Sequence, residues 1–501
     1  MAELPLFLLI FGAFAASMIV PALHGGASRN LEAARAFLYC AILGVIIFGM
    51  VAMTISGQKR RRGPLTGLLS LFSTMVFLPV ALAIPFHEGL GTTTFLNAYV
   101  EMVSAITTTG ATIFDDPERL NGTLHLWRAQ VAWLGGLIMW IAASAILAPL
   151  ALGGFEVTAQ NEPGQREVSG YLDQGIDPRA QLFRILLDLA PIYLGLTVLL
   201  WVVLIVSGDA ALVGLIHAMS IMSTSGISPQ GGLSSDGSGF TGEFLMVLFM
   251  LFALSRLTFS SDTVTATKGG LRTDPEFRIG FLIVMGVPLV LFLRHWIGAL
   301  DVAAEDDLEQ ALPALWGAFF TVMSFLTTTG FLSAEWDTAQ TWSGLETPGI
   351  ILIGLALIGG GVATTAGGVK LLRVYALYLN GARELEKLVH PSSVSRAGGD
   401  ARRVQSNGAF IAWIFFMLFA LSLAALTVII ALLGSDFDEA LVLSVAGLST
   451  TGPLLEVGTD APIRLAELQT GAKAAFCAAM VLGRLETLAI IALLTPDLWR
   501  G

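Results

Sequence analysis

The sequence is short of charged residues. Only 13% of its 501 residues are Asp, Glu, Lys or Arg, and 55% are hydrophobic. Soluble proteins carry roughly 25% charged residues. Many windows hold about 20 apolar residues, enough to cross the hydrocarbon core of a bilayer. These runs are continuous, whereas the strands of a transmembrane β-barrel alternate apolar and polar residues. We therefore predict an all-α polytopic membrane protein that lies in the lipid bilayer.

Cysteine and other metal-binding side chains are also scarce. The two cysteines, Cys40 and Cys477, lie inside apolar runs, where we expect small core residues rather than a disulfide or a metal site. The apolar segments hold no paired carboxylates and no His or Cys cluster, so we expect neither an enzyme nor an organic cofactor. The net charge of −11 gives no reason to expect a nucleic-acid partner.

A short polar pattern occurs four times. Each copy follows an apolar run, contains Ser and Thr residues, and reaches a glycine at Gly110, Gly226, Gly330 or Gly452. The glycines are 116, 104 and 122 residues apart, which is too long for a solenoid and fits four copies of a membrane unit. The candidate ion-binding residues are Thr108, Thr109, Gly110, Thr224, Ser225, Gly226, Thr328, Thr329, Gly330, Thr450, Thr451 and Gly452.

Hydropathy places ten spanning helices around these copies. We expect them at 4–22, 34–53, 65–84, 126–152, 183–206, 244–264, 280–293 with flanks, 350–379, 409–433 and 474–494. Four shorter apolar segments, at 95–109, 211–223, 315–326 and 440–448, suit re-entrant pore helices because they are too short to span. Loops rich in Lys and Arg then fall on one side and acidic loops on the other, which puts both termini in the cytoplasm.

This arrangement divides the chain into a leading pair of helices and four repeats. The predicted divisions are 1–56 for the pair, then 57–153, 154–270, 271–385 and 386–501 for pore repeats 1 to 4.

The repeated pattern suits a cation pathway. Non-helical backbone at membrane depth is tolerated where protein buries it or water lines it, and a ring of carbonyl oxygens can replace an ion's hydration shell. Glycine allows backbone angles that let consecutive carbonyls point the same way, and threonine hydroxyls can satisfy groups behind such a filter. The alternative is that each stretch is a small-residue contact between packed helices.

A glycine-rich segment follows the third copy. Its candidate gate residues are Gly359, Gly360, Gly361, Gly367, Gly368 and Lys370. Each glycine costs roughly 1 kcal/mol in a helix interior, so we predict an unwound loop beneath the filter. A kink or a close helix crossing is the alternative. Lys370 would be either a movable positive barrier or, as we slightly favour, a side chain that snorkels to the cytoplasmic surface.

Three polar residues lie inside apolar segments. Arg484 is costly at that depth and should face the pore or an acidic partner, although Glu486, two positions on, would not face it on a helix. Glu101 and His217 precede the first and second filters, and we expect both to brace the loops from behind.

Several segments together resemble a known family. They are Glu101-Met102-Val103-Ser104-Ala105-Ile106-Thr107-Thr108-Thr109-Gly110-Ala111-Thr112, Trp133-Leu134-Gly135-Gly136, Ala318-Phe319-Phe320 through Gly330-Phe331, and Met480-Val481-Leu482-Gly483-Arg484-Leu485-Glu486. They are similar to the Trk/Ktr/HKT superfamily of potassium transporters, and most similar to its bacterial TrkH type. The resemblance covers nearly the whole chain.

The resemblance implies four fused helix–pore-helix–helix repeats around one pore, a homodimer, and a peripheral nucleotide-binding subunit in the cytoplasm. It implies K⁺ as the transported ion, since a glycine in every filter accompanies K⁺ in this family. It also implies an intramembrane gating loop, with Arg484 in the pore below the filter.

We therefore predict potassium uptake across the bacterial cytoplasmic (inner) membrane. The second and fourth filters are less regular, which leaves Na⁺ permeation or coupling open. The alternative function is a Na⁺-permeable or cation-coupled secondary transporter of another solute, for which an inverted repeat would be expected.

Overall fold

The structure is a computed structural model, and it describes residues 4–55, 65–147, 178–233, 237–255, 274–297, 307–345, 347–389 and 406–486. Those residues form helices and loops, and no strand occurs among them. The leading segment holds α1 (Leu6–Ser17), α2 (Ile19–Ala27) and α3 (Leu31–Ile55). All three are mostly apolar, as expected of helices that face lipid, and the charged residues of α3, Glu32 and Arg35, lie near its start.

The first two repeats have the same order of elements. Repeat 1 holds α4 (Leu65–Val76), α5 (Leu78–Leu90), the pore helix α6 (Phe95–Ile106), η1 (Pro117–Arg119), α7 (Gly122–Ala142) and η2 (Ala143–Leu147). Repeat 2 holds α9 (Pro178–Ser207), the pore helix α10 (Ala211–Ser223) and α11 (Gly239–Leu254). Side-chain oxygens of Thr94 and Asn121 accept hydrogen bonds from the first turns of α6 and α7, which fixes where those helices begin.

The last two repeats follow the same plan with extra short helices. Repeat 3 holds α12 (Pro275–Ile297), the pore helix α13 (Asp307–Leu326), α14 (Trp336–Ser343), α15 (Gly349–Ile358) and α16 (Leu371–Val389). Repeat 4 holds α17 (Ser406–Leu432), the pore helix α18 (Phe437–Ser449), α19 (Leu454–Val457) and α20 (Thr470–Leu485).

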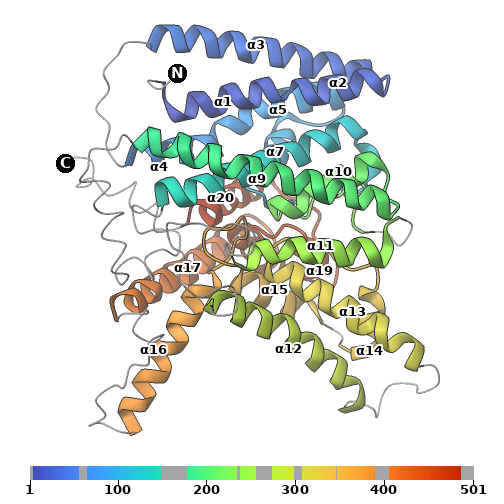
Figure 1. The fold of residues 1–501 in the computed structure, drawn as a ribbon, viewed down its shortest axis with the longest axis vertical. Coiled ribbons are helices and arrows are strands. Elements are labelled where there is room, and N and C mark those ends of the chain that lie inside the picture. The colour runs from blue at the N-terminus through green and yellow to red at the C-terminus, as the bar shows by residue number, and fades with distance from the viewer. Residues whose placement is uncertain are drawn as a thin grey trace.

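The four pore helices form the centre of a closed ring. Each packs against the helix that precedes it in its own repeat, and neighbouring repeats meet through the pairs α7–α10, α11–α13, α15–α18 and α20–α6. The last pair joins repeat 4 back to repeat 1. In Figure 1, α1, α3, α9 and α11 run in nearly the same direction across the molecule, while α12 and α16 diverge from them. Chain order therefore becomes spatial order around a common axis.

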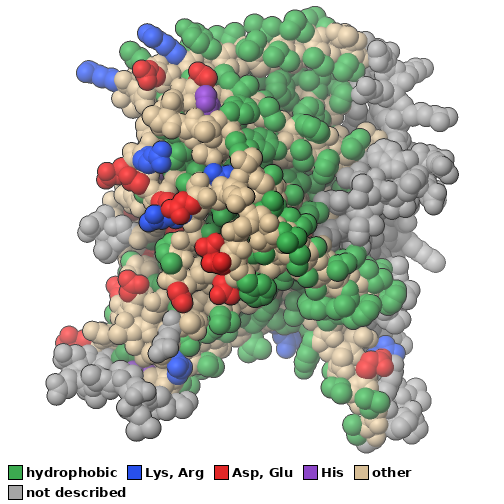
Figure 2. All heavy atoms as spheres, turned by 180° about the vertical axis from the view of Figure 1, so that it is seen from behind, with side chains coloured by type: hydrophobic (Ala, Val, Ile, Leu, Met, Phe, Trp, Pro, Cys, Tyr) green, Lys and Arg blue, Asp and Glu red, His purple; other side chains and the backbone are tan. Residues whose placement is uncertain are grey.

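The distribution of side chains fits a membrane environment. Within the described part of the chain, seven helical stretches are long and apolar enough to cross a bilayer: Leu6–Ala27, Leu31–Ile55, Thr66–Leu90, Gly122–Leu147, Leu182–Ser207, Pro275–His295 and Ala409–Leu432. Hydrophobic side chains cover the middle of the face shown in Figure 2, and many of its charged side chains gather along the left edge.

The remaining three of the ten expected spans do not pass that length test. The described parts of α11 and α20 stop at Leu254 and Leu485, short of the predicted ends, and the span predicted at 350–379 is broken by a loop. The third pore helix begins at Asp307 rather than at residue 315, because the helix-forming residues before residue 315 continue its helix.

The predicted domain divisions remain predictions. Three of them, at 56–57, 153–154 and 270–271, lie outside the described residues, and the division at 385–386 lies within α16. The predicted basic loop at 59–62 and most of the predicted acidic loop at 301–309 also lie outside them, and residues 307–309 belong to α13. The sidedness of the chain therefore stays a prediction.

Candidate cation pathway

The four pore helices end in the same way. One threonine in each copy, at Thr108, Thr224, Thr328 and Thr450, has a left-handed backbone conformation, with φ of 55°, 51°, 57° and 53°. A β-branched residue rarely adopts positive φ, because its Cβ crowds the backbone. Four repetitions of this strained geometry at one position in the pattern are typical of a functional constraint.

Backbone hydrogen bonds hold these residues in place. The amides of Thr109, Ser225, Thr329 and Thr451 donate to the carbonyl five residues earlier, at 2.9, 3.0, 2.8 and 2.9 Å. The amide of each left-handed threonine donates to the carbonyl three residues earlier. Together these bonds make a Schellman motif, a helix ending that usually requires glycine at the left-handed position. The motif ends each pore helix abruptly, just before the filter glycine.

Hydroxyl groups pair behind the filter in every copy. Thr107 and Thr109 are 2.8 Å apart at their Oγ1 atoms, and Thr327 and Thr329 are 3.0 Å apart. Ser223 Oγ donates to Ser225 Oγ at 3.1 Å, and Ser449 Oγ donates to Thr451 Oγ1 at 3.2 Å. These hydroxyls therefore bond to one another beside each helix ending. The middle threonine of each copy is left out of this pairing.

The filter glycines lie against the neighbouring copies. A Cβ at Gly110 would lie 1.6 Å from Ser225 O, one at Gly226 would lie 2.3 Å from Thr329 O, and one at Gly330 would lie 2.7 Å from a ring carbon of Pro453. A Cβ at Gly452 would lie 2.1 Å from the amide nitrogen of Ala111, which closes the ring. No side chain fits at any of these contacts.

The fourth copy differs from the others. Gly110, Gly226 and Gly330 have positive φ, whereas Gly452 does not. Its amide instead donates to the carbonyl of Thr109 at 2.6 Å. In this copy glycine is needed for close approach between chains, not for its backbone angle.

Polar residues on the pore helices brace the loops that follow the filters. The Glu101 carboxylate accepts from the Ile113 amide at 3.0 Å and pairs with Arg128 at 2.5 Å. His217 Nε2 bonds to Ser228 Oγ at 3.1 Å, as expected for a bracing role. Thr321, at the same position of the third copy, accepts from the Ser333 amide. The fourth copy has the apolar Leu443 at that position.

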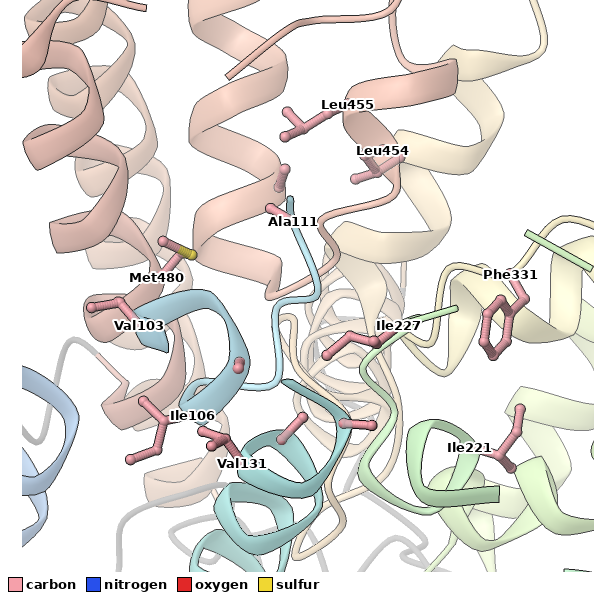
Figure 3. Packing of buried hydrophobic residues seen from close by; sticks show 14 of the residues in the cluster. Val103, Ile106, Ala111, Val131, Ile221, Ile227, Phe331, Leu454, Leu455 and Met480 are labelled. Atoms are coloured by element: carbon pink, nitrogen blue, oxygen red, sulfur yellow. The ribbon is translucent and has the colours of Figure 1, made fainter. Parts of the chain in front are cut away.

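The residue after each of the first three filter glycines is apolar and buried. Ala111, Ile227 and Phe331 belong to the central hydrophobic cluster, together with Leu454 after the fourth filter. Figure 3 shows Ala111 close to Leu454 and Leu455, and Phe331 close to Ile221. Packing of these apolar side chains therefore holds the four filter segments together in addition to their hydrogen bonds.

The glycine-rich segment is a loop, as predicted, and it lies directly against the filters. It runs from Gly359 to Lys370, between α15 and α16. The Gly367 amide donates to Thr328 Oγ1 at 2.7 Å, and Thr365 Oγ1 donates to the carbonyl of Met222 at 3.2 Å. A Cβ at Gly367 would lie 2.1 Å from Ser449 O. The loop thus contacts the ends of three pore helices.

Charged side chains surround this loop. Arg484 is buried, and its Nη1 donates to Thr365 O at 2.6 Å. Its Nε and Nη2 have no hydrogen-bond partner among the described residues. The alternative of an acidic partner for Arg484 is not what the structure shows: Glu486 pairs with Arg373 at 2.6 Å. Glu486 has a positive φ, so it lies beyond the helical turn of Arg484.

The slightly favoured prediction for Lys370 is wrong. Its side chain is buried with 8% exposure instead of reaching the cytoplasmic surface, and its Nζ donates to Ala366 O within the loop. The backbone of Lys370 has a φ of 85°, which turns the side chain back toward the loop. The ammonium group is therefore buried within the loop that contacts the ends of the pore helices.

Sequence reasoning missed several residues around the pathway. Glu243 on α11 accepts hydrogen bonds from Trp316, Ser333 and the Ala334 amide at 2.7 to 2.8 Å, which holds the loop after the third filter. Glu276 accepts from the Val362 amide at 2.8 Å. Arg373 lies 3.6 Å from the centre of the Phe415 ring. Each of these residues carries a charge within or beside an apolar helix. Burying a charge there costs free energy, and that cost was the signal by which the sequence could have pointed to them.

Comparison with known proteins decides the family. A family model described as TrkH, cation transport protein, matches residues 80–498. The chain belongs to the TrkH family. The pathway described above is therefore seen in a member of a cation transport family, and the predicted resemblance is confirmed. That membership points away from an enzyme.

Relatives support the assignment over the whole length. The chain is 30% identical to the Trk system potassium uptake protein TrkH of Salmonella typhimurium, over 97% of this chain and 96% of the relative. It is 30% identical to the Trk system potassium uptake protein TrkI of Halomonas elongata, over 83% and 80%. The crystal structure of the potassium transporter TrkH from Vibrio parahaemolyticus is similar, with a TM-score of 0.81 and 25% identity over 100% of this chain and 99% of that one. The predicted all-α polytopic fold is confirmed.

Proposed function

We propose that this protein carries K⁺ into the cell across the bacterial cytoplasmic membrane, through a path lined by the four filter segments. The observation that supports this most is the fourfold helix ending, in which a left-handed threonine precedes a close-packed glycine. This backbone brings carbonyl oxygens of one copy against the next, as Ser225 O lies against Gly110, and oxygen atoms are the ligands that hard cations prefer. Relatives named as potassium uptake proteins support K⁺ as the ion.

The transported K⁺ is then the substrate, and the protein needs no organic cofactor and performs no chemical step. The hydroxyls of Thr108 and Thr450 are buried and have no hydrogen-bond partner among the described residues. They are available as ion ligands on the inner side of the filter. Transport requires only that these oxygens bind the ion about as favourably as the water molecules that they replace.

The loop from Gly359 to Lys370 is the proposed gate. Two observations support this role: the loop contacts Thr328 and Met222 at the ends of two pore helices, and the positive side chains of Lys370 and Arg484 are buried beside it. A cation passing this point meets both steric blockage and repulsion in a medium of low dielectric constant. Conduction therefore needs the loop and Lys370 to move aside.

The assembly is proposed from the family resemblance. We infer a homodimer with both termini in the cytoplasm, regulated by a peripheral nucleotide-binding subunit. The basic stretch from Arg383 to Arg403 and the loop at 153–179 are candidate docking surfaces for that subunit. The second of these, and the first beyond α16, lie outside the residues that the structure describes.

The test is uptake of ⁸⁶Rb⁺ into proteoliposomes, with K⁺ or Na⁺ as competitor. Gly110→Ser adds a side chain where a Cβ alone would overlap Ser225 O and where φ is 74°, so selectivity should be lost. Gly286→Ser is the matched control, because nothing lies within 4 Å of a Cβ at Gly286. It should retain both uptake and preference for K⁺.

Each outcome has a clear meaning. Competition by K⁺ and not by Na⁺, lost only in Gly110→Ser, supports the four-filter pathway. Equal competition by Na⁺ in the unaltered protein favours the Na⁺-permeable alternative. Absence of any Rb⁺ uptake would contradict the proposed function and favour a secondary transporter of another solute.

A further inference from the structure

The brace of the second filter contains two buried atoms that lack partners. His217 Nδ1 and Asp209 Oδ2 are both inaccessible to solvent and make no hydrogen bond with any described residue. They lie 3.8 Å apart, and the two side chains are only 4% and 8% exposed. Leaving two buried polar atoms unpaired costs about 1–3 kcal/mol each. Such a pair face to face suggests that a proton is missing between them.

Hydrogen bonds on the Nε2 side of the His217 imidazole fix its tautomer. Ser228 Oγ donates its one hydrogen to Gly232 O at 2.8 Å, and it also accepts from the Gln230 amide. The contact between Ser228 Oγ and His217 Nε2, at 3.1 Å, therefore needs a hydrogen on Nε2. A neutral His217 then carries only a lone pair at Nδ1. That lone pair faces the Asp209 carboxylate, and two acceptors cannot bond.

A second proton resolves this conflict. Protonation of Nδ1 gives a donor that reaches Asp209 Oδ2 after a small shift of the side chains, and it turns the contact into a charge-assisted pair. Asp209 is suited to the anionic role: burial acts to raise its pKa, but His217 and Ser238 act against this, and its pKa lies below the ordinary value. Its Oδ1 accepts from the Ser238 amide at 2.8 Å, which holds the carboxylate in place.

The other charged groups near the ring are already engaged. Glu243 on α11 takes hydrogen bonds from Trp316, Ser333 and Ala334. On α7, Arg128 pairs with Glu101, and His125 contacts Pro117 O. Asp209, His217 and Glu243 also line a cavity of about 170 Å³, which is large enough for several water molecules that could deliver a proton.

The pair is positioned to act on the second filter. Ser228 lies two residues after Gly226, and the His217 ring packs against Phe331, the residue after Gly330, with 5.6 Å between ring centres. We propose that His217 is a positioning residue that binds a proton at Nδ1 and then bonds to Asp209. This bond makes the second filter more rigid and strengthens its preference for K⁺ over Na⁺. This inference rests on the proposed potassium uptake.

The experiment measures Na⁺ competition against ⁸⁶Rb⁺ uptake at roughly pH 6 and pH 8, on either side of the range in which imidazoles titrate. The pH is set equal on both sides of the proteoliposome, so orientation does not matter. All variants carry Glu456→Gln, because burial and the neighbouring Asp115 raise the pKa of Glu456 to about 7. That change removes a second group that would titrate in the same window.

Three variants are compared with this background. His217→Gln keeps an N–H toward Ser228 but cannot take up a proton, and Asp209→Asn removes the anion. His87→Gln is the matched control, since His87 also lies beside a carboxylate, at 3.3 Å from Glu88, but on α5. We expect Na⁺ to compete several-fold less at pH 6 than at pH 8 in the background and in the control. His217→Gln and Asp209→Asn should show no such difference while still carrying Rb⁺.

A pH difference that persists in His217→Gln, or that is missing from the background, overturns the inference. If no protein carries Rb⁺ at either pH, the proposed uptake has failed, and thermal unfolding in detergent decides the inference separately. The melting temperature of the background should then exceed that of His217→Gln by more at pH 6 than at pH 8, because the charged pair stabilises the fold only when it forms. Equal gains at the two pH values would contradict proton binding at His217.

Discussion

The filter segments and the loop from Gly359 to Lys370 touch each other, yet they are held in different ways. The helix ending of each filter copy is fixed by hydrogen bonds within a few residues, such as the amide of Thr329 on the carbonyl of Ser324, and packing between copies then holds the four endings together. The loop is fixed by residues far away in sequence: Glu276 holds the Val362 amide, and Arg484 holds the carbonyl of Thr365. The filter occurs four times, and the loop occurs once.

This difference indicates which part can move. A segment whose contacts are local keeps its shape when neighbouring helices shift, whereas a segment held by distant partners follows them. Glu276 lies on α12 and Arg484 on α20, so small displacements of either helix reach the loop directly. This contrast supports the proposed roles of the filter in ion selection and of the loop in gating. The following changes test that contrast, beginning with the largest expected effect.

Glu101→Ala should break the filter frame. The change leaves Arg128 buried without its 2.5 Å partner and the Ile113 amide without an acceptor. Removing one member of a buried ion pair costs about 3–5 kcal/mol, so the melting temperature in detergent should fall sharply. The double variant Glu101→Gln with Arg128→Met should recover most of that loss. A single variant as stable as the unaltered protein would show that the brace contributes nothing.

Gly367→Ala should displace the loop and leave the filter intact. Its Cβ would lie 2.1 Å from Ser449 O and 2.3 Å from Thr450 Oγ1, an overlap at the upper end of the usual cost of about 1–3 kcal/mol for overpacking. We expect higher basal Rb⁺ flux with unchanged preference over Na⁺. Gly354→Ala is the control, since nothing lies within 4 Å of a Cβ there. Lost selectivity would mean that the two regions are not separable.

Thr328→Val tests one hydrogen bond between the loop and the third filter copy. The change removes the acceptor of the Gly367 amide, which should favour the displaced loop by about 1 kcal/mol and raise basal flux several-fold. Thr108→Val makes the same change where the hydroxyl has no partner among the described residues. It should raise basal flux much less, although it can weaken ion binding. Single-channel recording in planar bilayers separates a change in loop position from a change in ion binding. Equal basal flux in both variants would argue that the hydrogen bond from the Gly367 amide to Thr328 does not hold the loop in place.

Glu456→Gln should have the smallest effect, on the dependence of stability on pH. Burial and the neighbouring Asp115 raise the pKa of Glu456 to about 7, so the folded state favours the neutral carboxyl. Stability should therefore be greatest near the ordinary pKa and fall as pH rises to about 7. Although protein atoms crowd the carboxyl and raise its pKa, the residue as a whole is exposed to water, so solvent screening should keep the loss below about 1 kcal/mol. The melting temperature should change less between pH 5 and pH 8 in the variant than in the unaltered protein. An unchanged pH dependence would show that another group causes it.

Much of the pathway could be predicted from residue patterns. The apolar runs and the four Ser/Thr–Gly copies indicated the pore helices, and α10 begins and ends where predicted, at Ala211 and Ser223. The five glycines from 359 to 368 indicated a break in the helix after the third filter. These predictions succeeded because helix length, helix ending and glycine content act over a few residues.

The partners of buried charges could not be predicted in the same way. Arg484 donates to Thr365, and Arg373 pairs with Glu486, a residue 113 positions away. Lys370 is buried because its backbone turns the side chain into the loop. Helical spacing argued against a pair between Arg484 and Glu486, but nothing in the local pattern names the actual partners or separates the burial of Lys370 from snorkelling.

The sequence by itself determined a membrane protein with four pore helices, each ended by the same short polar pattern, since these properties depend on local hydrophobicity and backbone preference. The tertiary structure decided which copies touch, which carbonyls face their neighbours, and how the loop is anchored beneath them. The ring of contacts from Gly110 to Ser225 and onward to Pro453 joins residues more than a hundred positions apart. Such contacts depend on how all the helices pack together, and no single stretch of sequence contains that information.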